Sequence, residues 1–217
     1  YVNFLDSHDG YTLGDFIRIA TKAVGHSDVI KNPEEVIKLT PEQLKLNKLA
    51  AMFLFTSQGI TMIHSGQEYA RSKIIPFDID IPDSHKGQLD HNSYEKDNET
   101  NYINYGHAEL NKELIEYYKG LIELRKGHPA FRRAKYEEIT FGDVKENPFV
   151  ISFTINYDGK LYLVTMNASA EEFEQKLPDG KWKVFANEKE ANAEGIKVIS
   201  GNISLKSKTG IILQKEL

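Results

Sequence analysis

The sequence contains no cysteine, which excludes disulfide bonds, thiolate metal sites and cysteine nucleophiles. No apolar run approaches the roughly 20 residues that a membrane-spanning helix needs. Positive charge is not in excess either, because the net charge is −5, and this argues against nucleic acid or an anionic membrane as the partner. These absences exclude several classes of protein and leave the compartment open.

The remaining composition is that of an ordinary globular protein. The chain has 217 residues, of which 40% are hydrophobic and 27% are charged, so it suits one large domain or two small ones. Aromatic residues are plentiful, with 11 Tyr, 11 Phe and 1 Trp, which fits both core packing and stacking against carbohydrate.

The first ten residues carry the strongest functional pattern. Tyr1–Leu5 is mainly apolar and predicts a buried strand, and Asp6-Ser7-His8-Asp9 follows it directly before Gly10. Ligands of parallel α/β proteins bind at the carboxyl ends of strands. We therefore expect this segment to deliver a histidine and two carboxylates to a site. Because the chain opens on a strand, we also expect it to be a piece of a larger protein.

A second strand repeats the arrangement. Residues 60–63 predict another short buried strand, which leads into the polar segment His64–Glu68. Between the two strands, apolar spacing predicts helices over 13–20 and 41–55. Strand, helix and strand in this order predict a parallel unit whose two polar segments emerge on the same side.

The second of these helices has a clear beginning. Thr40 and Gln43 form a capping-box pattern, and Pro41 occupies the first helical position. Residues 49–55 are apolar nearly all round, so we expect this half of the helix to need burial.

The next segment, residues 71–108, is rich in Pro, Asp, Asn and Tyr and predicts a long loop of functional character. A helix is predicted over 108–126. From about residue 132 the pattern becomes strand-like and includes a hairpin with Asp158-Gly159 at its turn. Further short strands are predicted near 171–177, 181–187, 196–205 and 209–214.

Two parallel strands cannot close a sheet by themselves, and a complete (β/α)8 barrel takes about 250 residues. We therefore predict an α/β region followed by an all-β region. Residues 1–131 would be the C-terminal part of a (β/α)8 catalytic barrel, comprising strands 7 and 8 with their helices. Residues 132–217 would form a C-terminal antiparallel β-sandwich.

Three blocks of sequence carry a family resemblance. They are Phe4–Asp9, Ser57–Lys73, and the stretch that combines Asn92-Ser93-Tyr94 and Asn101 with Tyr117–Arg132. In this order they resemble the seventh strand, the eighth strand with its loop, and the eighth helix of α-amylase-family glycoside hydrolases, most closely the pullulanase-like debranching enzymes. The resemblance covers nearly the whole chain once the β region is included.

The resemblance implies a retaining α-glucan hydrolase that cleaves α-1,6-glucosidic bonds. Such enzymes use a carboxylate nucleophile and a carboxylic acid about 5–5.5 Å apart. By resemblance both would lie upstream of Tyr1, while Asp9 would be the third carboxylate, which stabilises the transition state. The chain alone is then expected to be inactive.

The resemblance also implies substrate contacts. His8 would hydrogen-bond the same sugar as Asp9, and Asn92, Tyr94 and Asn101 would lie in the substrate loop. Asp6, Glu68 and Trp182 are interpreted as structural residues. Compared with the usual pattern of the family, Ala70 replaces a larger residue and Tyr105 stands where Trp is common.

The expected partners are an α-glucan such as pullulan, starch or glycogen branches, and the upstream part of the same protein. The apolar half-helix at 49–55 is expected to have lost its partners, and because exposed apolar patches promote association, self-association is expected. No cofactor and no metal site is evident, although the resemblance leaves room for a structural calcium ion. The linkage preference between α-1,6 and α-1,4 stays open.

Two alternatives of other classes remain. One is a non-catalytic carbohydrate-binding or interaction module in which the β region binds the ligand. The other is a metal-dependent phosphohydrolase built on His8 and Asp9 with His64, His85 or His91, which would need several ligands that converge on one ion.

Overall fold

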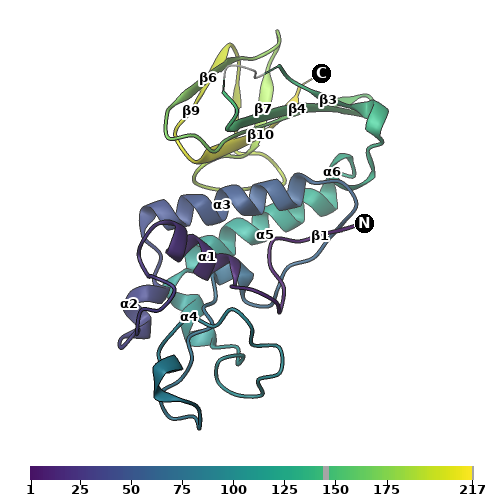
Figure 1. The fold of residues 1–217 in the computed structure, drawn as a ribbon. Coiled ribbons are helices and arrows are strands. Elements are labelled where there is room, and N and C mark those ends of the chain that lie inside the picture. The colour runs from purple at the N-terminus through teal and green to yellow at the C-terminus, as the bar shows by residue number, and fades with distance from the viewer. Residues whose placement is uncertain (144–146, 217) are drawn as a thin grey trace. The chain divides into compact units, whose positions relative to one another are not determined.

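The computed structural model describes residues 1–143 and 147–216 (Figure 1). The chain divides into two compact units, each of which is described by itself. One unit comprises Tyr1–Asn3, Lys48–Thr61 and the chain from Glu116 onward, and the other comprises Phe4–Asn47 and Met62–Ile115. Within the described residues, no helix has the length and apolar character that a membrane crossing requires.

The helices lie mostly in the first two-thirds of the chain. The α-helices are α1 (Leu13–Ala20), α2 (Pro33–Ile37), α3 (Pro41–Thr56), α4 (Tyr105–Leu110), α5 (Lys112–Gly127) and α6 (Ala130–Arg133). Single 3-10 turns occur at Gln67–Tyr69, Asp83–His85 and Tyr136–Glu138.

The first strand pair is parallel, as predicted. Strand β1 (Val2–Asn3) pairs with β2 (Ile60–Thr61), and Val2 lies opposite Ile60. The prediction that these strands are buried is wrong, because Val2 is 49% exposed and Ile60 is 64% exposed. The reason is that the sheet has two strands among the described residues, which leaves its faces and edges open.

Helix α3 begins with the predicted capping box. The Gln43 backbone N–H donates to the Thr40 hydroxyl at 3.3 Å, and the Thr40 N–H donates to the Gln43 side-chain oxygen at 2.9 Å. The expectation that the apolar half of this helix lacks partners is wrong. Met52, Leu54 and Phe55 are buried, and Phe55 packs edge-on against Tyr118 of α5 with ring centroids 5.7 Å apart.

The connection after α3 is held by Arg125, a buried residue of α5. Its guanidinium donates to the carbonyls of Phe55 and Ser57 at 2.8 Å each and to that of Gly59 at 2.6 Å. It also donates to the carbonyl of Phe131. One side chain therefore supplies the hydrogen-bond donors for backbone carbonyls at the end of α3, in the segment before β2 and in α6.

The predicted helix over 108–126 is divided in the structure. Helix α4 ends at Leu110 and α5 starts at Lys112, and Asn111 between them leaves helical geometry with φ −123° and ψ 32°. The Asn111 amide donates to the carbonyls of Ile37 and Tyr69, at 2.9 Å each, and its oxygen accepts from the N–H of Leu39 at 3.0 Å. These tertiary contacts hold the Asn111 side chain at a break that local spacing alone does not predict.

The C-terminal region is antiparallel. Its larger sheet has the order β3-β4-β5-β10-β7-β8, and β6 pairs with β9 in a second sheet. The predicted hairpin joins β4 to β5, with Asp158 at φ 50° and Gly159 at φ 71° as a primed turn requires. The strands are β3 (Ile139–Phe141), β4 (Val150–Tyr157), β5 (Lys160–Asn167), β6 (Phe173–Lys176), β7 (Trp182–Ala186), β8 (Lys197–Ile199), β9 (Asn202–Leu205) and β10 (Thr209–Lys215).

A buried cluster joins the two sheets. It contains Ile203 and Leu205 of β9, together with residues of the larger sheet such as Leu213. Trp182 is fully buried in the same cluster and donates its indole N–H to the carbonyl of Pro178 at 2.9 Å, so it is a core residue. The predicted strand at 196–205 is two strands, β8 and β9, separated around Gly201 at φ 83°, and β3 is an addition to the prediction.

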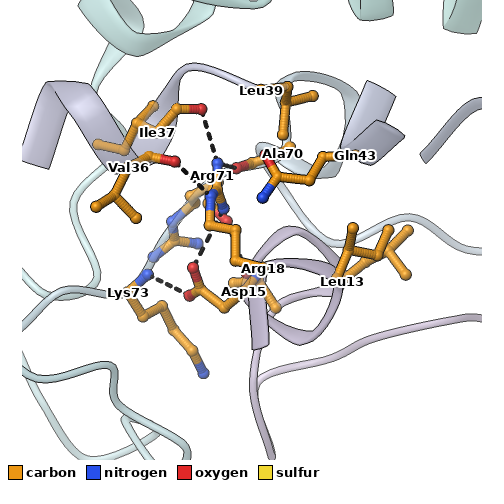
Figure 2. A network of polar contacts seen from close by, with 12 residues as sticks. Leu13, Asp15, Arg18, Val36, Ile37, Leu39, Gln43, Ala70, Arg71 and Lys73 are labelled. Carbon is orange, nitrogen blue, oxygen red and sulfur yellow. Dashed lines mark hydrogen bonds and ion pairs between the residues drawn. The ribbon is translucent and has the colours of Figure 1, made fainter. Parts of the chain in front are cut away.

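Helix α1 is anchored by a buried ion pair (Figure 2). Arg18 and Asp15 are both fully buried and lie 3.2 Å apart. Arg18 also donates to the carbonyls of Val36 and Ile37 at 2.8 Å each and to that of Ala70 at 2.9 Å. A single guanidinium thus fastens α1 to the end of α2 and to the turn that follows residue 64.

Candidate functional site

The polar segment after β2 forms a tight turn. Gly66 has φ 91°, which only glycine adopts readily, and a 3-10 turn follows over Gln67–Tyr69. The Glu68 carboxylate accepts from the N–H of Gly66 at 3.1 Å. Glu68 therefore stabilises its own turn, which agrees with its interpretation as a structural residue.

Asp6 lies beneath the candidate site. It is buried, and its carboxylate accepts from the N–H of Leu13 at 2.8 Å, close to the start of α1. The Nδ1 atom of His64 lies 3.6 Å from the same carboxylate. The two polar segments that the sequence places after separate strands therefore meet at Asp6 and His64.

His8 and Asp9 are open to solvent. Their side chains are 66% and 72% exposed, and His8 Nε2 lies 3.4 Å from Asp9 Oδ1. An imidazole that can donate and a carboxylate that can accept are therefore adjacent and free to face a ligand.

The long loop, residues 71–108, contacts the segment that carries His8 and Asp9. Asp9 and Asn92 form an isolated antiparallel bridge, and both residues are exposed. The backbone N–H of Asn92 donates to Asp90 Oδ1 at 2.7 Å, and Lys96 pairs with the other oxygen of Asp90. The loop is thereby held at the point where it meets Asp9.

Tyr94 adds an aromatic ring beside His8. The two ring centroids are 6.2 Å apart and the rings are tilted by 60°. Tyr94 is 57% exposed, and its hydroxyl donates to Glu95 at 2.8 Å, which raises the pKa of the phenol. The structure therefore brings four of the predicted site residues together, and these are His8, Asp9, Asn92 and Tyr94.

The fifth predicted residue is placed differently. The Asn101 oxygen accepts from the hydroxyl of Ser93 at 2.7 Å, and its amide donates to the carbonyls of Lys96, at 2.7 Å, and of Ser93. These contacts close residues 93–101 into a loop. A sugar contact for Asn101 stays a prediction, whereas the described hydrogen bonds of its side chain all go to Ser93 and Lys96 of its own loop.

Arg71 supports the same loop and was given no role from the sequence. It is buried and donates to the carbonyl of Asn101 at 2.8 Å and to that of Ser65 at 3.3 Å. Burial lowers its pKa. Arginine is mostly exposed in proteins, so the residue type alone gave no signal for this position.

The residues that the structure describes contain no group of three or more His, Cys, Asp or Glu side chains placed to hold a metal ion. The metal-dependent alternative requires such a group at His8 and Asp9. It therefore gains no support from the geometry. What the arrangement offers is one carboxylate, one imidazole, one amide and one phenol on an exposed face, which is a set suited to hydroxyl groups.

Comparison with known proteins gives a consistent result. No protein-family model matches the chain. It is 30% identical over 131 residues to a pullulanase of Bacillus subtilis, an alignment that covers 60% of this chain and 14% of that protein. It is 26% identical over 237 positions to pullulanase A of Streptococcus pneumoniae, covering 90% of this chain and 18% of that protein.

Solved structures agree with these relatives. The pullulanase of Anoxybacillus sp. LM18-11, solved in complex with maltotetraose, superposes with a TM-score of 0.74 at 26% identity. The match covers 99% of this chain and 28% of that one. The resemblance to pullulanase-like debranching enzymes of the α-amylase family is thereby confirmed, and the chain spans less than a third of the length of these three proteins.

Proposed function

We propose that this chain is the C-terminal portion of a retaining α-glucan hydrolase that acts on α-1,6-glucosidic bonds. In the complete protein, Asp9 stabilises the transition state, and His8, Asn92, Tyr94 and Asn101 contact the substrate. The nucleophile and the general acid lie upstream of Tyr1, so residues 1–217 alone do not hydrolyse glycans. The similarity to pullulanases and debranching enzymes supports a glycoside hydrolase portion.

The observation that carries the proposal is the meeting of His8 and Asp9 with Asn92 and Tyr94. A carboxylate and an imidazole on adjacent residues can accept from and donate to neighbouring hydroxyls of one sugar. Contacts that strengthen as the ring distorts lower the barrier, since catalysis depends on binding the transition state more tightly than the substrate.

The architecture is part of the proposal. Strands β1 and β2 become strands 7 and 8 of a (β/α)8 barrel, and residues 132–217 form the β-sandwich. The exposure of Val2 and Ile60, at 49% and 64%, supports further strands on this sheet, because apolar residues of a parallel sheet are normally covered. The buried cluster shared by the two antiparallel sheets supports the sandwich.

The test compares two proteins on pullulan. The 217-residue chain is expected to release no reducing ends, whereas a longer protein that includes the upstream barrel is expected to be active. Intact mass of the source protein identifies the natural length. Hydrolysis by the chain alone would contradict the placement of the nucleophile and the acid, and an inactive longer protein would contradict the assigned reaction.

The binding-module alternative has one observation in its favour. A hollow of about 780 Å³ lies in the β region, lined by residues that include Lys189, Lys197 and Asn202. None of the described residues that line it is aromatic, which is unfavourable for stacking on sugar rings. Titration of the whole chain with maltotetraose separates the two ideas. Loss of binding in Tyr94→Ala favours the hydrolase site, and loss in Lys197→Ala favours the β region.

A further inference from the structure

Lys73 is a lysine with no exposed surface, located just after the turn that follows β2. Its ammonium donates to the carbonyl of His8 at 3.1 Å and to that of Gly10 at 2.8 Å. These two carbonyls flank Asp9 in the chain. The lysine therefore holds the backbone on both sides of the exposed carboxylate without touching the carboxylate itself.

The main chain of Lys73 holds the other half of the site. The N–H of Asp90 donates to the carbonyl of Lys73 at 2.8 Å, and Asp90 Oδ1 accepts from the N–H of Asn92 at 2.7 Å. Lys73 is thus hydrogen-bonded to both segments that form the bridge between Asp9 and Asn92. A shift of Lys73 would change the position of the carboxylate relative to the amide.

The residues that hold the main chain of Lys73 form a buried network of polar contacts (Figure 2). Its N–H donates to Asp15 Oδ2 at 2.8 Å, and the other oxygen of Asp15 pairs with Arg18. Arg18 is fixed in turn by the carbonyls of Val36, Ile37 and Ala70. Lys73 is therefore connected through Asp15 to α1, α2 and the turn at Ala70.

An ammonium is costly to bury, and a lysine without a specific role is normally found at the surface. Burial lowers the pKa of Lys73, while nearby Asp90 opposes this effect. A methionine would fill a similar volume without that cost. What only the ammonium provides is two directed donors for the carbonyls of His8 and Gly10.

We propose that Lys73 is the positioning residue of the site, which sets the backbone around Asp9 in register with Asn92. Its role in catalysis rests on the proposed function, whereas its role in fixing the Asp9 segment does not.

The first test measures hydrogen–deuterium exchange in the 217-residue chain that carries the substitution Lys73→Met. Peptides that cover residues 8–13 and 90–92 are expected to exchange about tenfold faster than in the unmodified chain, while peptides from residues 147–216 are unchanged. Lys86→Met is the matched control, because Lys86 lies in the same loop and pairs with exposed Asp83. It is expected to exchange as the unmodified chain does.

Two exchange results would overturn the proposal. One is a folded Lys73→Met chain in which residues 8–13 exchange at the same rate as in the unmodified chain. The other is faster exchange in all peptides together with a lower melting temperature, which would indicate only a general loss of stability. If the methionine variant does not fold, Lys73→Gln keeps a donor and is expected to retain part of the local protection.

The second test measures pullulan hydrolysis in the longer protein. Lys73→Met is expected to lower kcat about 100-fold with KM little changed, because a misplaced carboxylate loses transition-state contacts. A normal kcat would contradict the positioning role. If the longer protein is inactive before mutation while the exchange result holds, the proposed function fails and the positioning of Asp9 stands.

Discussion

Asp9 and Asn92 face each other across an antiparallel bridge, although one follows the first strand and the other lies deep in the long loop. The contact defines the candidate site, because it brings the carboxylate and imidazole of one segment to the amide and phenol of another. The residues that make it possible, Lys73 and Arg71, are buried beneath the loops and carry no chemistry of their own at the exposed face.

Asp9→Asn is expected to abolish most hydrolysis in the longer protein. The amide keeps the size of the side chain and removes the charge that stabilises an oxocarbenium-like transition state, so kcat should fall by about 10²–10³. Asp97→Asn is the control, since Asp97 is an exposed carboxylate of the long loop that also carries Asn92. Pullulan kinetics measure both, and equal effects of the two substitutions would argue against a specific role for Asp9.

Asn101 and Asn92 are both proposed to contact the substrate, but they are expected to differ in their contribution to stability. Asn101→Ala removes the hydrogen bonds to Ser93 and Lys96 and should lower the free energy of unfolding by about 1–2 kcal/mol. Asn92→Ala, at an exposed position, should leave stability unchanged and weaken maltotetraose binding. Urea unfolding and calorimetric titration measure the two effects, and the reverse pattern would contradict these assignments.

Arg125→Met is expected to be strongly destabilising. It leaves the carbonyls of Phe55, Ser57 and Gly59 without their donor in a buried place, which should cost about 3 kcal/mol or more. Arg133→Met, at an exposed position of α6, is the control and should change stability little. Similar unfolding midpoints for the two variants would show that the Arg125 contacts contribute little.

His128 is expected to make the chain less stable in mild acid. Burial lowers its pKa below the ordinary histidine value of 6.5, and the centroid of its ring lies 4.6 Å from that of Phe185. The unfolded chain therefore takes up a proton below about pH 6.5 that the folded chain accepts only at lower pH, so stability falls as pH decreases through this window.

Substitution tests this linkage. His128→Gln should flatten part of the fall of the melting temperature as the pH decreases below about 6.5, and His85→Gln, at an exposed position, is the control. Burial also lowers the pKa of His107, so some dependence should remain. An unchanged pH profile in His128→Gln would exclude His128 as a source of the effect.

The sequence by itself determined the features that depend on neighbouring residues. Thr40, Pro41 and Gln43 specify the start of α3, and Asp158-Gly159 specifies the hairpin turn, because these residues satisfy local backbone groups and dihedral angles. The polar segments after β1 and β2 could be found in the same way, since an apolar strand that ends in charged residues is a local pattern.

The tertiary structure decided what depends on residues far apart in the chain. The side chain of Asn111, at the break between α4 and α5, donates to carbonyls of Ile37 and Tyr69, and the side chain of Asn101 faces its own loop through contacts with Ser93 and Lys96. Lys73 is buried because carbonyls of a remote segment surround its ammonium. The sequence could identify Asp9 and His8 as candidates, but the residue that positions them depends on hydrogen bonds between segments, and such bonds leave no periodic signal.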